Sequence, residues 1–185
     1  VLATGADPEA TQKFAGMTIP QQSTPGIIAV TTPMPQLIER VIAAPGVHLH
    51  QLEDGRIVIG EQEGPPQTEA HNSRLEGRPT EFPSAELARQ HGYRLIQSAA
   101  AIVPQLTGAY LDWAEIGWRP LPIDGHPVIG RSTENPNVYM AIMHSGVTLA
   151  PLVGQLSTLE IVNNRELPEL NNYRPDRDFE LLRRY

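Results

Sequence analysis

Residues 116–130, IGWRPLPIDGHPVIG, constrain this chain more than any other stretch. They predict an aromatic strand that ends in a single arginine, Arg119, followed by a rigid turn of prolines and glycines and a second apolar strand. After a further apolar run at residues 137–143, the tripeptide HSG at 144–146 interrupts the pattern before a helix. A guanidinium can form two parallel hydrogen bonds with a carboxylate, and a glycine before a helix directs backbone N–H groups at an anion. These two steps therefore predict an anion-binding region.

The same two segments resemble the C-terminal signature of a known enzyme family. Its members carry a G-x-R-P-x-x-x-D-G-x-P-x-I-G segment, then an apolar strand, a turn rich in histidine and glycine, and a helix that contains L-A-P. The residues that fit are Gly117, Arg119, Pro120, Asp124, Gly125, Pro127, Ile129, Gly130, His144, Gly146, Leu149, Ala150 and Pro151. By this pattern the chain is similar to the FAD-dependent amino acid oxidases and dehydrogenases, the group that includes D-amino acid oxidase, glycine oxidase and sarcosine oxidase.

The resemblance implies roles for residues of both segments. Arg119 corresponds to the arginine that holds the substrate carboxylate in the family. The start of the helix near residue 146 would lie against the N1 and C2 carbonyl edge of the flavin, where the positive end of a helix stabilises negative charge. The residues expected to contact FAD are Thr4, Gly5, His144, Ser145, Gly146, Val147 and Thr148. The resemblance implies no metal ligand.

Some of these residues have a simpler explanation when they are considered alone. An arginine at the end of a strand is most often a surface charge or an ion-pair partner. His144 is explained about as well by a ring that bonds only to the backbone. Gly146 is expected to need a backbone conformation or a close approach that a β-branched residue would disturb.

The reaction that the resemblance implies is oxidation of the C–N bond of an amino acid or N-alkyl amino acid. Hydride would pass from the α-carbon to N5 of FAD, and the imine would then be hydrolysed. Two other classes of function remain open. The chain could be a non-catalytic fragment that binds small carboxylates through Arg119, or a partner subunit whose missing half is supplied by another chain.

Composition narrows the partners and the environment. The 185 residues are 40% hydrophobic and carry a formal net charge of -7, and no basic face is evident, so nucleic acid and anionic membranes are poor candidates. The absence of cysteine excludes disulfides, thiolate metal sites and a cysteinyl flavin link within these residues. No apolar run is long enough to span a bilayer, and no signal peptide stands at the start, so we expect a cytoplasmic protein.

The first five residues, VLATG, predict a buried strand that runs into a glycine. Such a start suggests a piece of a longer protein, without the G-x-G-x-x-G loop that would hold the FAD pyrophosphate; the alternative is an ordinary N-terminal strand. We expect a mixed α+β and α/β fold from the C-terminal part of a two-domain FAD enzyme. Residues 1–16 and 116–165 would belong to the FAD-binding domain. Residues 17–115 would form a substrate-binding domain around an antiparallel sheet, and residues 166–185 a tail that ends near the natural C-terminus.

Local signals in the first half of the chain predict one helix and several strands. Residues 7–16 form the helix, with Asp7 as its N-cap and Gly16 as its stop. Strands are expected at 26–32 and 41–44. A hairpin at residues 47–60 should turn at Asp54-Gly55, with φ positive at both central positions. Its two strand faces would carry Val47 and Leu49 on one side and His48 and His50 on the other; a solvated or pocket-side face explains the histidines better than a metal does.

The second half should begin with a long connection at residues 61–83 and a helix at 84–106 capped by Ser84. Asp124 is expected to bond to the backbone of its own turn rather than act as a general acid. Ser145 or Thr148 should cap the last helix, which tolerates Pro151 because it lies in the first turn. The buried stripe of that helix should consist of Leu149, Leu152, Val153, Leu156 and Leu159.

Overall fold

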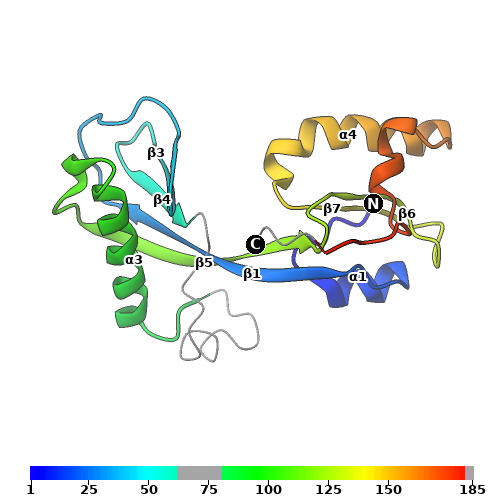
Figure 1. The fold of residues 1–185 in the computed structure, drawn as a ribbon, viewed down its shortest axis with the longest axis horizontal. Helices are drawn as coiled ribbons and strands as arrows, with labels where there is room; N and C mark the ends of the chain where they lie inside the picture. Colours follow the sequence, from blue (N-terminus) through cyan, green and yellow to red (C-terminus); the bar gives the residue numbers. More distant parts are fainter. Residues whose placement is uncertain (62–80, 182–185) are drawn as a thin grey trace. The chain divides into compact units, whose positions relative to one another are not determined.

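The computed structural model describes residues 1–61 and 81–181, without the side chains of residues 22–24. These residues form two compact units. Unit 1 contains Val1–Thr24 and Arg119–Tyr185, and unit 2 contains Pro25–Trp118 (Figure 1). Among the described residues, no helix combines the length and the apolar character that crossing a membrane requires.

Unit 2 is built on a sheet of five strands in the order β2-β3-β4-β1-β5. The strands pair antiparallel from β2 to β3, from β3 to β4 and from β4 to β1. Two strands, β1 and β5, continue beyond the boundary of the unit. The bounds are β1 Gln21–Thr31, β2 Ile42–Ala44, β3 Val47–Gln51, β4 Ile57–Glu61 and β5 Leu111–Pro122. The expected antiparallel sheet is therefore present.

One helix, α3 (Ala85–Ala100), covers one face of this sheet, and a short helix η1 (Pro104–Leu106) follows it (Figure 1). Ser84 caps α3 as predicted, because its hydroxyl accepts a hydrogen bond from Leu87 N. The helix ends earlier than the predicted residue 106. The core beneath it joins helix and sheet, and its fully buried side chains include Ile27, Leu49, Ile57, Ile59, Leu95 and Leu106.

The hairpin between β3 and β4 confirms the predicted strands and corrects the predicted turn. Val47 and Leu49 are buried and His48 is exposed, as the alternation requires. The turn closes with hydrogen bonds from Gly55 N to Leu52 O and from Leu52 N to Arg56 O. Only Gly55 has a positive φ there, at 88°. The loop is therefore a type I turn followed by a left-handed glycine, in place of a two-residue turn with both φ positive.

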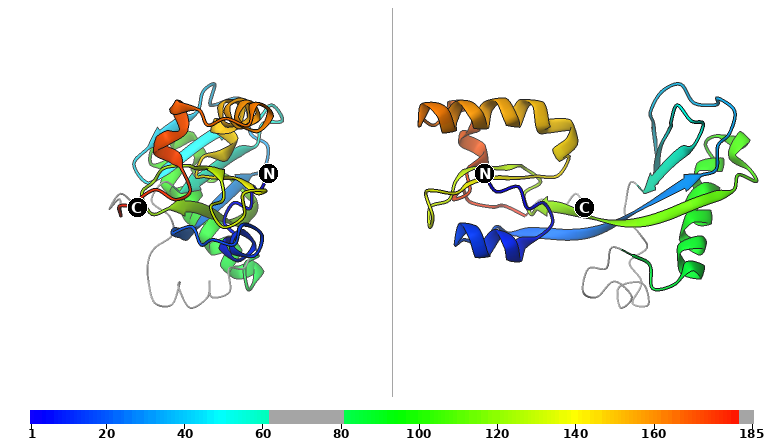
Figure 2. Two further views of the ribbon diagram at one scale, coloured as in Figure 1. Left: turned by 90° about the vertical axis from the view of Figure 1, so that its right-hand side faces the viewer. Right: turned by 180° about the vertical axis from the view of Figure 1, so that it is seen from behind.

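Unit 1 has a small sheet between helices. Strands β6 (Val128–Arg131) and β7 (Tyr139–Ile142) pair antiparallel, and Leu2 forms a parallel bridge with Met140. Helices α1 (Pro8–Ala15) and α4 (Gly146–Asn163) lie on opposite sides of this hairpin (Figure 2). The side chains of β6 and β7 point alternately to the two faces of the hairpin. Those on one face pack with α1, and those on the other face pack with α4 and the short helix η2 (Pro168–Tyr173).

Helix α1 confirms its predicted caps. Asp7 accepts a hydrogen bond from Ala10 N, and Gly16 takes the left-handed conformation at the C-terminus. Ser132, which follows β6, also contacts the C-terminal end of α1, because its hydroxyl donates a hydrogen bond to Ala15 O at 2.6 Å.

Helix α4 departs from the prediction in two ways. Pro151 lies at its sixth residue, inside the helix, so the explanation from the first turn was wrong. Leu152 and Leu159 are 55% and 42% exposed, and the buried positions on this helix are instead Val153, Ser157 and Glu160. The predicted buried stripe is therefore only partly correct.

The C-terminal tail is held to unit 1 by two ion pairs that the sequence did not predict. Arg174 donates to both carboxylate oxygens of Glu160, at 2.9 and 2.6 Å. Arg177 does the same with Asp124, at 2.7 and 3.0 Å. Tyr139 donates to Glu160 at 2.6 Å, and burial together with this bond raises the pKa of Tyr139 to about 12. The two carboxylates are 5% and 8% exposed, which makes the tail part of the folded unit.

These pairs predict how stability depends on pH. Burial by itself raises the pKa of Asp124 and of Glu160, but the bonds from Arg177 and Arg174 prevail and hold both below their ordinary values of 3.8 and 4.5. A carboxylate with a depressed pKa stabilises the folded state above its ordinary pKa, and this contribution disappears as the pH falls through the folded pKa. We expect the free energy of unfolding to decline from about pH 4.5 downward, measured by urea denaturation at stepped pH. The decline should be shallower in Asp124→Asn; an unchanged slope would contradict the assignment.

Candidate active site

Arg119 lies within strand β5, three residues before the strand ends at Pro122. The prediction that the strand ends in the arginine was therefore wrong. As a whole residue, Arg119 is half-buried. A half-buried guanidinium is better suited than an exposed one to bind a carboxylate, because water competes less for the same bonds.

His144 follows β7 and is also half-buried. Its pKa is lowered first by burial and second by the positive charge of Arg119. The second cause indicates that the charge of Arg119 acts on His144, and both residues belong to unit 1. Because the pKa falls below the ordinary value of 6.5, His144 is neutral at pH 7. Two of the predicted site residues, which lie on different elements, therefore influence each other electrostatically.

Ser145 occupies the N-cap position of α4 but does not cap the helix with its side chain. Its Oγ lies 2.8 Å from His144 Nδ1 instead. The first turn contains no acidic residue, and Gly146, Val147 and Thr148 are all exposed. The first-turn N–H groups therefore receive no acceptor from the N-cap side chain and can bind an external anion.

The strained backbone at this turn belongs to Ser145 and not to Gly146. Ser145 has φ 60°, in the left-handed region, whereas Gly146 has no positive φ. A Cβ added to Gly146 would meet only Met143 Cγ, at 3.9 Å. The expected need for glycine at position 146 is therefore not supported by local backbone conformation.

This geometry predicts the effect of replacing Ser145. Asparagine adopts the left-handed conformation more readily than serine, so Ser145→Asn should raise the free energy of unfolding by about 0.5 kcal/mol. Ser145→Val is the matched opposite and should lower it by roughly 1 to 2 kcal/mol. Urea denaturation of both variants measures the difference. Equal stability of the two would show that the turn relaxes without strain.

Thr4 and Gly5 leave the same edge of the small sheet as His144. Leu2 N donates to Tyr139 O at 2.7 Å, and Ala141 N donates to Leu2 O at 2.9 Å. This bridge is parallel, so the chain after Leu2 and the chain after β7 emerge on one side. Thr4 Oγ1 lies 2.6 Å from Thr11 Oγ1, which ties the segment to α1, and Gly5 has φ 58°.

The residues fit an anionic ring edge in their chemistry. The uncapped start of α4 offers backbone donors, and the neutral His144 adds no second charge beside Arg119. Among residues 1–61 and 81–181, no group of three or more histidine, aspartate or glutamate side chains could hold a metal ion. The backbone donors at the start of α4 are the feature that could bind an anionic group.

One supporting residue was missed by the sequence analysis. Arg177 binds Asp124 and also donates to His126 O at 3.2 Å, so it fixes the turn that joins β5 to β6. Asp124 itself bonds to His126 N, as predicted for a residue of its own turn. No signal in the sequence singled out this pair, because Arg177 stands between Asp176 and Asp178, and either could have been taken as its partner.

Comparison with known proteins identifies the same family that the sequence resembles. The family model described as FAD dependent oxidoreductase, DAO, matches residues 1–158. An opine oxidase subunit of Agrobacterium tumefaciens (strain Ach5) is 29% identical over 150 residues, which are 81% of this chain and 35% of that protein. Glycine oxidase of Bacillus licheniformis is 35% identical over 72 residues, 38% of this chain and 20% of that protein. The chain thus spans about a third or less of the curated relatives it matches.

A solved structure shows the same fold. The structure of glycine oxidase from Geobacillus kaustophilus superposes with a TM-score of 0.73 at 23% identity, and the match covers 96% of this chain and 45% of that one. The family model extends over most of the sequence, through β5, β6, β7 and into α4. The chain therefore belongs to the DAO family of FAD-dependent oxidoreductases.

Proposed function

We propose that the complete protein oxidises the C–N bond of an amino acid or an N-alkyl amino acid. The observation that carries this proposal is the electrostatic proximity of Arg119 and His144 beside the uncapped start of α4. A cation that can bind a carboxylate then lies close to donors that can bind an anionic ring edge. Membership of a flavin-dependent family supplies the class of chemistry.

We assign the two parts of the chain to two tasks. Residues 1–16 and 116–165 contribute to FAD binding, and residues 17–115 contribute the antiparallel sheet of a substrate-binding domain. The uncapped helix α4 and the segment Thr4–Gly5 support the first assignment. The sheet β2-β3-β4-β1-β5 supports the second.

Arg119 would bind the substrate carboxylate through two parallel hydrogen bonds. The planar guanidinium matches the two carboxylate oxygens, which a lysine ammonium cannot do with one point charge. This contact orients the α-carbon and selects substrates that carry a carboxylate. Its half-burial strengthens each bond relative to bulk water.

FAD, when bound, would supply the acceptor for the hydride that leaves the α-carbon. The residues proposed to contact it are Thr4, Gly5, His144, Ser145, Gly146, Val147 and Thr148. Backbone N–H groups at the start of α4 would stabilise negative charge on the ring edge by about 0.3 to 1 kcal/mol. In the tautomer in which Nδ1 accepts a hydrogen bond from Ser145 Oγ, Nε2 of the neutral His144 ring carries the proton.

The test is an anaerobic substrate panel on the purified complete protein. Glycine, an N-methyl amino acid and an opine are mixed with it, and the flavin absorbance is followed. Each is matched with an amine that lacks the carboxylate. Bleaching by at least one carboxylate substrate and slow bleaching by its matched amine support the proposal. Bleaching by the amines alone, or by none of the compounds, contradicts it.

A second candidate is that the protein functions as one component of a larger enzyme. The relative from Agrobacterium tumefaciens favours it, because the name of that protein describes one subunit of opine oxidase and therefore a part of an assembly. Size-exclusion chromatography with light scattering on protein purified from its natural source distinguishes the two cases. Co-elution with a different polypeptide at constant stoichiometry supports this second candidate, and a single species of one polypeptide contradicts it.

A further inference from the structure

Unit 1 contains a cavity of about 230 Å³ at the end of α4. Three arginines line it from three separate elements: Arg131 ends β6, Arg165 follows α4 and Arg174 follows η2. Three arginines at one pocket stand out in a chain with a formal net charge of -7. Because like charges repel, acidic partners or a bound anion would stabilise such a cluster.

Glu160 also lines the cavity, but its charge is already compensated. Arg174 binds both of its carboxylate oxygens, Tyr139 donates to it at 2.6 Å, and Leu167 N donates to it at 2.6 Å. Four donors occupy the carboxylate, and Glu160 is 5% exposed. The Glu160–Arg174 pair is therefore neutral as a whole, and Glu160 does not compensate the charges of Arg131 and Arg165.

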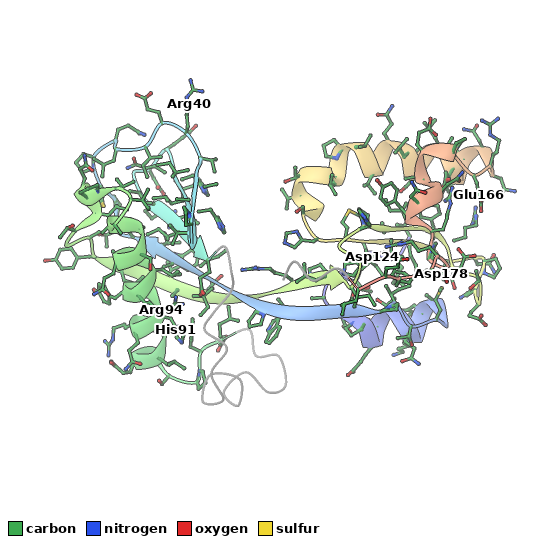
Figure 3. All side chains as sticks on the ribbon, viewed as in Figure 1. Arg40, His91, Arg94, Asp124, Glu166 and Asp178 are labelled. Carbon is green, nitrogen blue, oxygen red and sulfur yellow. The ribbon has the colours of Figure 1, made fainter. Side chains whose placement is uncertain are left out.

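Arg131 and Arg165 have no carboxylate partner within the part of the chain that the structure describes. Arg131 donates to Pro136 O at 3.0 Å and to Asn164 Oδ1 at 3.4 Å, and both acceptors are neutral. The remaining acidic lining residue is Glu166, labelled in Figure 3, and it is exposed, as Arg131 and Arg165 are. Two uncompensated cations against one carboxylate leave the cavity with a positive excess.

Arg174 adds a further unsatisfied donor. Its Nε is buried, and no acceptor for it lies among the described residues. A buried N–H without a partner costs free energy, and a ligand or ordered water commonly satisfies it. This one unsatisfied donor and the surplus positive charge of the same lining residues both favour an anionic ligand.

We propose that this cavity binds a compact oxyanion, a carboxylate or a phosphate group, through Arg131 and Arg165. Both anions accept several hydrogen bonds from guanidinium groups. The volume holds several times the roughly 30 Å³ that a water molecule occupies in the liquid, so a small polar anion fits. The proposal does not depend on the proposed oxidation of amino acids.

The test is calorimetric titration of the purified complete protein at low ionic strength, with inorganic phosphate in one arm and succinate in the other. We expect at least one anion to bind with a Kd of about 10 mM or tighter. Arg131→Gln and Arg165→Gln should each weaken binding about tenfold or more, because each removes a charge-assisted contact. Arg89→Gln, on the exposed surface of α3, is the control with the same charge change and should bind as the parent does.

The outcomes separate the sources of the ligand. Binding of succinate alone identifies a carboxylate site, binding of phosphate alone a phosphate site, and binding of both a general oxyanion site. Absence of binding in both arms overturns the proposal. Unchanged binding in both cavity variants also overturns it, as does an equal loss in Arg89→Gln, which would indicate non-specific attraction by charge. The thermal unfolding temperature of each variant verifies that the fold is retained.

Discussion

Arg119→Ala in the complete protein is expected to lower kcat/KM for an amino acid substrate by on the order of a hundredfold. If the guanidinium binds the substrate carboxylate in a half-buried position, the variant loses two charge-assisted hydrogen bonds. Arg119→Lys retains the charge but loses the paired geometry, so its kcat/KM should fall between those of the parent and the alanine variant. Steady-state kinetics on matched concentrations of one amino acid measure all three proteins.

The control for the Arg119 variants is a second compound that lacks the carboxylate. A decarboxylated amine gains nothing from a guanidinium, so its slow turnover should hardly change in Arg119→Ala. Arg89→Ala, which removes a 63% exposed side chain from α3, serves as the control protein and should behave as the parent does on both substrates. An equal loss on the amino acid and the amine would mean that Arg119 supports the structure or the flavin.

The pKa of His144 gives a further readout of the same contact. The positive charge of Arg119 contributes to the lowered pKa, after burial. Removal of that charge in Arg119→Ala should let the pKa of His144 rise toward 6.5, which NMR titration of the imidazole can follow. A change at His144 would establish the proximity of the two residues independently of catalysis.

Elements that depend on short-range chemistry were predictable from the sequence. Helix α1 begins after an aspartate and ends at a glycine, and the caps have the predicted geometry. The strands β3 and β4 followed from alternation around Asp54-Gly55. In these cases the determining interactions lie within a few residues of one another, so the pattern itself contains the information.

Pro120 was predicted to lie in a turn and Pro151 in the first turn of a helix, and both predictions were wrong. The tertiary environment decides whether the missing N–H of a proline costs free energy. Pro120 lies inside β5, which is the last strand in the order β2-β3-β4-β1-β5. An edge strand tolerates proline because one side of its backbone has no ladder partner. Pro151 lies inside α4 and leaves the carbonyl of Val147 without its helical donor, but Val147 is 94% exposed and water can serve. The sequence does not reveal either environment.

The candidate site depended on contacts too distant for pattern analysis. Arg119 and His144 lie on β5 and after β7, and only the folded unit makes them electrostatic neighbours. Arg177 pairs with Asp124 across 53 positions. The tail was predicted only as a stretch of mixed charge because local acidic residues such as Asp178, four residues after Arg174, compete in the sequence with the distant carboxylates that Arg174 and Arg177 bind.

Glu160→Gln is expected to lower the free energy of unfolding by about 3 to 5 kcal/mol, because it leaves a buried guanidinium without its counter-charge. Arg174 has a side chain that is only 13% exposed, and both of its terminal nitrogens bond to Glu160. Glutamine retains one oxygen for Leu167 N or Tyr139 but cannot accept two charge-assisted bonds at once. Urea denaturation at pH 7 measures the loss.

The matched controls separate the lost charge pair from a general loss of packing. Glu166→Gln changes an exposed carboxylate a short distance along the chain and should alter stability by less than about 0.5 kcal/mol. The double variant Glu160→Gln/Arg174→Met removes both charges, so it should be more stable than Glu160→Gln alone, because no uncompensated cation remains. The loss of stability in the double variant could equal the losses of Glu160→Gln and Arg174→Met added together. The cost would then come from lost packing and hydrogen bonds. In that case the ion pair would not be the interaction that holds the tail to α4.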